Sequence, residues 1–221
     1  MKKMPNKKER EYRNMTMAVR EVENESEETE NMTVEGYATT FNEPYTLYED
    51  NDIIYREQVD PDAFAETDMD DVIMQYDHEG RVFARTANET LSLNVDDKGL
   101  FIRANLGGTE IGRNLFEEIR GGYTDKMSFG FIVDKDEELR TDAEDGRVDI
   151  LRTITGISKL YDVSAVSIPA NNGTSIGAET RSLIDGAINQ IQTERSEAEK
   201  LELMKKRTEL RARALGKEIE K

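Results

Sequence analysis

The feature that most constrains the fold is a long series of short segments rich in β-branched and aromatic residues, each ended by a turn signal. The segment Met32–Phe41 (MTVEGYATTF) is typical, since Asn42-Glu43-Pro44 ends it directly. Residues of these types favour strands, and Asn and Pro favour turns. Many short strands separated by turns indicate a barrel or a sandwich. We therefore predict a mainly β body over residues 15–178.

The expected elements can be placed along this body. Strands are expected at 15–22, 32–41, 53–59, 72–76, 82–86, 91–95, 100–106, 126–133, 148–155 and 160–168. Asp60 before Pro61 predicts a short helix, because aspartate caps helices and proline suits their first position. Thr109–Arg120 has apolar residues at helical spacing and predicts a second helix. The charged stretch 134–146 is expected to be a flexible excursion. The fold class is thus mainly β with flanking helices (α+β).

The C-terminal tail, residues 179–221, differs from the body. It lacks proline, and apolar residues recur at steps of three and four: Ile184, Ala187, Ile188, Ile191, Ala198, Leu201, Met204, Ala212 and Leu215. This spacing predicts an amphipathic helix or a weak coiled coil, although Glu194, Lys205 and Thr208 interrupt the stripe. The polar residues 1–14 are expected to be a flexible N-terminus. The chain is thus divided at 1–14, 15–178 and 179–221.

Charge and composition exclude several function classes. The chain has 30 basic and 47 acidic residues, a net charge of −17, and from position 181 onward it carries 10 basic and 8 acidic residues. Because a body with this much negative charge repels phosphates, we expect no direct nucleic acid binding. No apolar run approaches the roughly 20 residues of a membrane span, and no apolar stretch follows the basic start. Cysteine is absent, which excludes disulfides and thiolate chemistry and fits a reducing, intracellular compartment.

His78 is the only histidine in the sequence. Zinc catalysis normally uses two or three histidines or cysteines, so a zinc peptidase is not expected. Neither a Walker loop nor another nucleotide fingerprint is present, and we expect no cofactor and no metal, although carboxylates alone could still bind magnesium or calcium. A lone histidine is most often structural. If the chain performs acid–base chemistry near neutral pH, however, His78 is the natural group for it.

A serine nucleophile would need this base beside it, and the base would need an orienting partner. Ser128 lies in the segment Met127–Phe131 (MSFGF), where Gly130 would leave room for a substrate backbone. Taken on spacing alone, an ordinary strand serine is the favoured interpretation of Ser128.

Several separated motifs occur in an order that resembles the prohead maturation proteases of tailed bacteriophages. They span about residues 32–175 and are, in order, VEGYA (34–38), Phe41-Asn42, Glu57, PDAF (61–64), Asp77-His78, DKGL (97–100), MSFGF (127–131), DVSAV (162–166) and Pro169-Ala170-Asn171. Two positions depart from the common pattern. Asp62 stands where glycine is frequent, and Asp162 stands where glutamate is common.

The resemblance implies a fold and a function. Such proteases are distantly similar to the herpesvirus assembly proteases (assemblins), which implies a largely antiparallel β-barrel flanked by helices. They act in the host cell cytoplasm inside the assembling procapsid, where they cut the scaffolding segment from the major capsid protein and often cut themselves. The expected partners are the capsid protein and, by analogy, a second copy of the chain. The competing hypothesis is a non-catalytic scaffolding protein that retains the fold.

The resemblance also assigns roles to residues. Ser128 matches the nucleophile, His78 the general base and Asp162 the acidic residue that orients it. Asp77 is the poorer orienting residue, because neighbouring side chains on a strand point to opposite faces. The hydroxyl of Ser164, or a carboxylate other than that of Asp162, remains an alternative third member.

Two further regions have open roles. The loop with Asn171, Asn172 and Gly173 follows the strand that carries Asp162, and its backbone amides are candidates for an oxyanion hole, although the loop could equally be only a turn. The helical tail could target the protease to the capsid, be removed by self-cleavage, or pack on its own body.

Overall fold

A computed structural model describes the backbone of residues 10–15, 20–21, 32–166 and 178–219, and all structural statements refer to these ranges. The chain forms two compact units, residues 1–181 and 182–221. The first unit is mainly β and holds every described strand. The fold class expected from sequence is therefore confirmed at this level: strands dominate, and one of the two α-helices is C-terminal.

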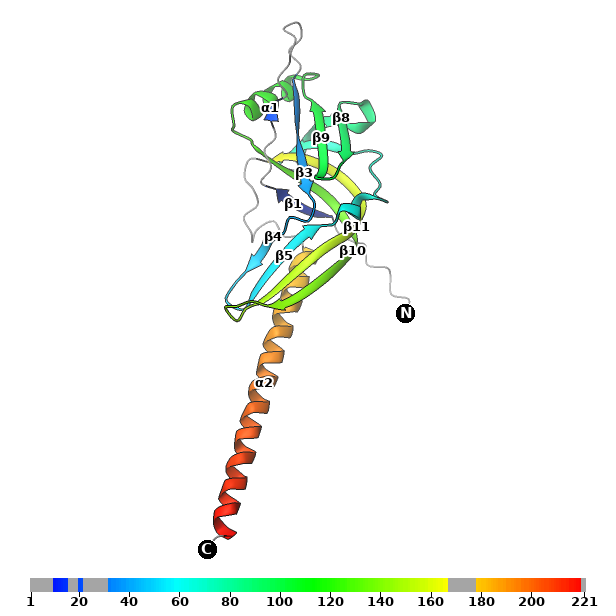
Figure 1. Ribbon diagram of the computed structural model, residues 1–221. Helices are drawn as coiled ribbons and strands as arrows, with labels where there is room; N and C mark the ends of the chain where they lie inside the picture. The colour runs from blue at the N-terminus through cyan, green and yellow to red at the C-terminus, as the bar shows by residue number, and fades with distance from the viewer. Residues whose placement is uncertain (1–9, 16–19, 22–31, 167–177, 220–221) are drawn as a thin grey trace, which may run out of the picture. The chain divides into compact units, whose positions relative to one another are not determined.

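The strands form two sheets (Figure 1). The larger sheet has the order β1 (Glu11–Met15), β10 (Lys126–Asp142), β11 (Val148–Val166), β5 (Ile53–Val59) and β4 (Tyr45–Glu49). In addition, β6 (Ile73–Tyr76) pairs with β11 on one side and with β7 (Glu79–Arg85) on the other. The smaller sheet has the order β2 (Arg20–Glu21), β3 (Thr33–Thr40), β9 (Gly99–Asn105) and β8 (Leu91–Val95).

The helices begin where capping residues permit. Helix α1 (Glu110–Arg120) starts after Thr109, whose side chain accepts a hydrogen bond from the amide of Gly112, as an N-cap should. The short helix predicted after Asp60 is the 3₁₀ helix η1 (Pro61–Phe64), and a second, η2 (Thr86–Asn88), follows β7. Helix α2 (Ala178–Ile219) is a continuous 42-residue helix, as the tail pattern predicts.

The core lies where strands present alternate residues to the interior. In β5, the side chains of Ile53, Tyr55, Glu57 and Val59 are buried, while those between them are half-buried. The one charged residue in that buried row is Glu57, with no exposed surface. A buried carboxylate is costly unless it is paired, so its partners must be part of the fold.

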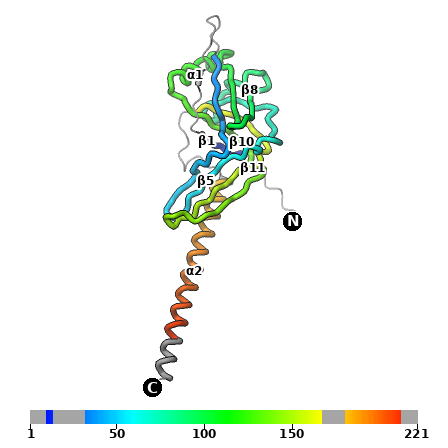
Figure 2. The backbone as a smooth tube through the Cα atoms, in the orientation of Figure 1, coloured from blue at the N-terminus to red at the C-terminus, as the bar shows by residue number. Residues whose placement is uncertain are grey.

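The hairpin of β10 and β11 is the longest pairing, and Figure 2 traces the two strands side by side. It corrects two expectations. Residues 134–142 are strand, although their charge predicted a flexible excursion, and 148–166 is one strand instead of two. Exposed charged residues are tolerated here because the partner strand satisfies the backbone on one side. The sequence pattern alone cannot reveal that partner.

The N-terminal part also differs from expectation. Residues 11–14 lie in β1, although 1–14 was expected to be flexible. Of the strand expected at 15–22, residue 15 ends β1 and residues 20–21 form β2, and the other positions lie outside the described residues. Strand β4 was not predicted. Polar residues occupy much of β1, and their burial depends on charge partners that are distant in sequence.

The expected antiparallel barrel is not confirmed. The described ladders form two open sheets, and β11 pairs in parallel with both β5 and β6. The first half of β11 pairs with β5 and the last part with β6, so one long strand serves two neighbours in succession. This arrangement brings the end of β6 beside the end of β11.

A tight turn joins β6 to β7. Tyr76 pairs with Glu79, and the two residues between them, Asp77 and His78, both have positive φ, 48° and 60°. Positive φ at both central residues is the signature of a type I′ hairpin turn. The amide of Asp77 donates to the carbonyl of Ala165 at 3.0 Å, which fixes the turn to β11. Asp77 and His78 therefore lie in a turn, and the expected strand alternation does not apply to them.

We predict that Asp77→Val destabilises the protein by about 1–2 kcal/mol, because a β-branched residue is strained at positive φ. Asp77→Asn is the matched control, since asparagine tolerates this conformation and should leave stability nearly unchanged. Urea unfolding of both variants measures the difference. Equal midpoints for the two variants would contradict the turn geometry.

Candidate active site

Three elements of the larger sheet carry the residues expected to form a catalytic triad. Strand β10 carries Ser128, β11 carries Asp162, and the β6–β7 turn carries His78. The antiparallel register places Ser128 opposite Ser164 and Gly130 opposite Asp162. Because residues two apart on a strand share a face, Ser128 and Asp162 can both point toward the turn.

The three side chains form a continuous chain of hydrogen-bonding contacts. His78 Nε2 lies 2.5 Å from Ser128 Oγ, and His78 Nδ1 lies 2.5 Å from Asp162 Oδ1. This is the arrangement of a nucleophile, a base and a carboxylate that orients the base. Fifty residues separate the serine from the histidine in sequence, so only the fold brings them together.

The carboxylate of Asp162 is fully buried and has three partners among the described residues. Besides His78, Oδ1 accepts a hydrogen bond from Ser164 Oγ at 2.7 Å, and Oδ2 accepts one from Arg10. Ser164 therefore contacts the carboxylate and not the imidazole. Asp162, the residue expected at the third position, contacts His78 Nδ1 directly.

Gly130 has a different role from the one expected. A Cβ at this position would meet the Asp162 carboxylate and would lie 2.9 Å from both Tyr12 Cε1 and Arg10 Nε. The space beside Ser128 that glycine leaves is thus filled by Asp162 and by residues of the N-terminal segment. Glycine is needed here so that the carboxylate can approach β10.

The N-terminal segment Arg10–Arg13 contacts all three members of this triad. Ser128 Oγ donates a hydrogen bond to the carbonyl oxygen of Arg13 at 2.7 Å, and the ring of Tyr12 lies against His78, with centroids 4.4 Å apart. Ser128 is fully buried, and the His78 side chain is only 15% exposed. The sequence pattern gave no signal for this segment.

A cluster of buried charges anchors β1. Arg13 donates to Glu57 at 2.5 and 2.9 Å, and Arg152 donates to Glu57 at 2.8 Å and to Glu11 at 3.2 Å. The hydroxyl of Thr180 donates to Glu11 at 2.8 Å. All five side chains are nearly or fully buried. Each charge has an opposite partner, which is the condition for burying ions in a stable protein.

This pairing shifts the pKa values of the cluster. Burial alone would raise the pKa of Glu11, but the attraction of Arg13 and Arg152 outweighs it, so the pKa lies below its ordinary value. Burial would lower the pKa of Arg13, and the neighbouring carboxylates, Glu57 first, raise it well above its ordinary value. Glu11, Arg13 and Arg152 are therefore held in their ionised forms near neutral pH.

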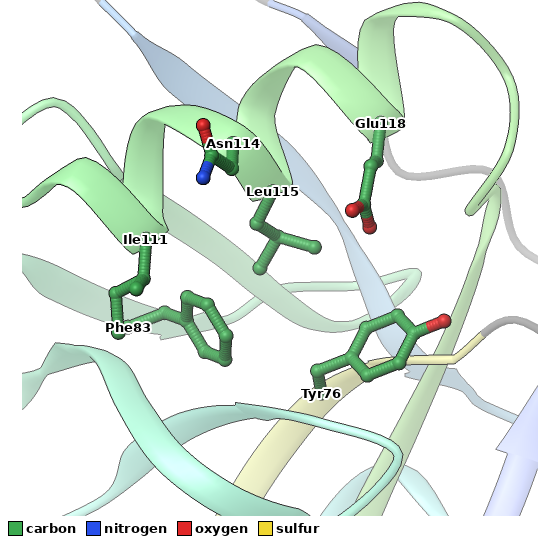
Figure 3. Close-up of a pocket in the computed structure, with 6 residues that line it drawn as sticks. All are labelled: Tyr76, Phe83, Ile111, Asn114, Leu115 and Glu118. Atoms are coloured by element: carbon green, nitrogen blue, oxygen red, sulfur yellow. The ribbon is translucent and has the colours of Figure 1, made fainter.

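A pocket of about 270 Å³ lies beside the hairpin that carries His78 (Figure 3). Tyr76 and Phe83 of the hairpin face α1 across it, and the remaining lining residues come from α1: Ile111, Asn114, Leu115 and Glu118. The lining is mainly apolar and contains none of the three triad residues.

Other expectations can be placed only in part. The oxyanion candidates Asn171, Asn172 and Gly173 lie outside the described residues. Within the described ranges, no cluster of three or more His, Asp or Glu residues is arranged to hold a metal ion. None of the described helices is both long enough and apolar enough to span a membrane.

We predict that Glu11 contributes stability that depends on pH. Because folding depresses its pKa, the contribution is present above the ordinary value of 4.5 and is lost as pH falls through the folded pKa. The free energy of unfolding of the wild type should therefore fall more steeply between pH 5 and pH 3 than that of Glu11→Gln. Denaturant titrations across this range measure both slopes, and parallel slopes would contradict the ion-pair account.

Comparison with known proteins places the chain in a family. No curated protein and no solved structure matched the chain. The family described as caudovirus prohead serine protease matches residues 17–187, which is more than three quarters of the sequence. The match includes the positions of all three triad residues. The chain therefore belongs to the caudovirus prohead serine protease family.

Proposed function

We propose that the protein is a serine endopeptidase of phage head maturation in which Ser128 is the nucleophile, His78 the general base and Asp162 the orienting carboxylate. The observation that carries the proposal is the contact chain from Ser128 Oγ through the imidazole to Asp162, with 2.5 Å at each contact. Membership of the prohead serine protease family supports the same reaction class.

The geometry suggests how each residue acts. With Asp162 accepting from Nδ1–H, the neutral imidazole presents the lone pair of Nε2 to the hydroxyl of Ser128. The base takes the hydroxyl proton as Oγ bonds to the carbonyl carbon of the substrate, and a tetrahedral intermediate forms. His78, now protonated, is stabilised by the Asp162 carboxylate. It then returns the proton to the leaving amine as the peptide C–N bond breaks.

The second half of the reaction uses the same residues. Water replaces the amine, gives its proton to His78 Nε2 and attacks the acyl-enzyme ester, and Ser128 leaves as it regains a proton. Backbone amides must stabilise the negative oxygen in both steps. We keep the segment with Asn171, Asn172 and Gly173 as the proposed donor because it follows β11, the strand that carries Asp162.

The proposed substrate is the scaffolding segment of the major capsid protein, cut inside the procapsid in the host cell, and the chain itself is a second proposed substrate. Helix α2 supports the latter, because the chain from residue 182 onward forms its own compact unit. Several large apolar residues of α2 are exposed, namely Leu183, Leu201, Leu203, Met204 and Leu210. Removal of this unit would leave β10, β11 and the turn intact.

We also propose that the protease forms a dimer during assembly, by analogy with assembly proteases.

We predict that co-expression with the cognate major capsid protein yields a shortened capsid protein only when the triad is intact. Ser128→Ala and His78→Ala should each lower cleavage by on the order of 10⁶-fold in kcat, because both act in one unit. Intact-mass spectrometry of all products measures this and also shows whether the chain loses its own tail.

Ser92→Ala is the matched control, since Ser92 is an exposed serine on β8, in the other sheet. It should cut as the wild type does. Normal shells with uncut capsid protein in every sample would instead favour the non-catalytic scaffolding function.

We predict a graded effect at the carboxylate. Asp162→Asn should lower kcat by about 10⁴-fold, because an amide no longer holds the imidazole in the productive tautomer. Ser164→Ala removes one hydrogen bond to the same carboxylate and should cost only about fivefold. Peptide hydrolysis rates of the two variants measure the ratio, and equal losses would argue against Asp162 as the orienting residue.

A further inference from the structure

The strand β1 covers the proposed catalytic residues in the manner of a bound peptide. It runs antiparallel to β10, and its residues 11–15 pair with residues 131–127, so that Asn14 lies opposite Ser128. Among the described strands, β1 ends this side of the sheet, and without it β10 would be an open edge. Extended peptides bind such edges by adding a strand.

Strand β1 lies outside the family match, unlike the strands of the protease body. The match to the prohead protease family begins at residue 17, two residues after β1 ends. All the strands from β2 to β11 lie inside the match. The strand that covers Ser128 is thus the one described strand outside the matched part of the chain.

Two side chains of β1 pair with buried charges of the protease body. Arg13, the residue whose carbonyl accepts the Ser128 hydroxyl, places its guanidinium on the buried carboxylate of Glu57. Glu11, two residues earlier on the same face, accepts from Arg152 at 3.2 Å. The strand therefore supplies one acidic and one basic side chain at alternate positions.

The body provides the complementary charges without help from β1. Glu57 also accepts from Arg152 at 2.8 Å and from the Tyr45 hydroxyl at 2.6 Å, and Arg152 also donates to Asp136 at 2.6 Å. Glu57 and Arg152 thus keep partners if β1 leaves. Departure of β1 would remove one positive and one negative charge from this buried cluster. A strand that replaces β1 must therefore supply the same pair of charges.

We propose that the edge of β10, with Glu57 and Arg152, is the substrate-binding site of this protease and that it accepts extended segments with an acidic residue followed, two positions later, by a basic one. In the free chain β1, with its sequence Glu11-Tyr12-Arg13, occupies this site. The proposal rests on the proposed proteolytic function and specifies its substrate class. The basic residue is the one whose carbonyl lies at Ser128.

The bound geometry of β1 is that of an occluding strand and not of a substrate under attack. Attack requires the carbonyl carbon at Oγ and the carbonyl oxygen directed to other donors, whereas here the oxygen of Arg13 accepts from Oγ itself. A hydroxyl has one proton, so Ser128 cannot donate it to His78 at the same time.

A second contact weakens the triad in the same state. The guanidinium of Arg10 pairs with Asp162 Oδ2. The Asp162 carboxylate is thereby shared between Arg10 and the imidazole, so less of its charge is directed at the orientation of His78. Both effects disappear when the segment leaves the site.

The full-length Arg13→Ala chain tests the proposal, because it removes the side chain that holds β1 on Glu57. Removal of one partner of a buried charge pair should weaken seating of β1 enough to raise kcat/KM on a fluorogenic peptide by about thirtyfold or more. Arg103→Ala is the matched control, since Arg103 is an exposed arginine on β9, and its rate should equal that of the wild type. Hydrogen exchange of the β1 amides should accelerate in Arg13→Ala alone.

Peptide preference provides the second arm. Labelled peptides that contain Glu-Tyr-Arg, Glu-Tyr-Glu or Lys-Tyr-Arg are offered to Arg13→Ala for hydrolysis, and to the double variant Arg13→Ala/Ser128→Ala for binding by fluorescence anisotropy. The first peptide should be preferred at least about tenfold over each of the others in both assays.

The two proposals fail in different ways. Hydrolysis without this preference, or unchanged rates in Arg13→Ala, would overturn the assigned site and leave the protease function standing. Preferential binding with no hydrolysis of any peptide would support the site and contradict the proteolytic function. Cleavage of the wild-type chain after Arg13, seen by intact mass, would overturn the assignment of β1 as an occluding strand.

Discussion

The antiparallel pairing of β10 with β11 is the constraint on which the proposed active site depends. Its register sets Ser128 opposite Ser164 and Gly130 opposite Asp162, so the nucleophile and the carboxylate have a fixed spacing. The parallel pairing of β6 with β11 then brings the type I′ turn, and with it His78, to the same place. A slip of one residue in the ladder would turn Ser128 to the opposite face and separate the three groups.

The position of β1 depends on a cluster of buried charges that come from distant parts of the chain. Glu57 comes from β5, Arg152 from β11, and Glu11 and Arg13 from β1. The two charges of β1 are buried against Glu57 and Arg152, which makes the position of β1 sensitive to the loss of any one of these partners. A strand held by a backbone ladder and by side-chain charge pairs can be exchanged for another extended strand that carries the same charges. The same contacts can thus seat an internal strand and recognise a substrate.

The sequence predicts the parts of this structure that depend on local pattern. Strands β5 and β8 match the expected segments at both ends, and Thr109 caps α1 as its sequence indicates. Periodicity cannot identify the charged continuation of β10, because those residues are strand only through their pairing with β11. The parallel ladders of β11 and the division of the described strands into two open sheets likewise depend on strand pairing, which a single sequence does not specify.

The candidate site divides in the same way. Ser128, His78 and Asp162 were identified through the order of motifs shared with a family, whereas their spacing in sequence carries no geometric information. The contribution of Arg10, Tyr12 and Arg13 could not be foreseen, since a polar N-terminal segment resembles a mobile tail until its charge partners are known.

The most direct test of the central claim is covalent labelling of the full-length chain with a fluorophosphonate, followed by peptide mapping. In the Arg13→Ala chain, where β1 no longer covers the nucleophile, the account predicts modification of Ser128 that is lost when His78 is also replaced by alanine. Failure to modify Ser128, or modification that does not depend on His78, would contradict the assignment of these residues as nucleophile and base.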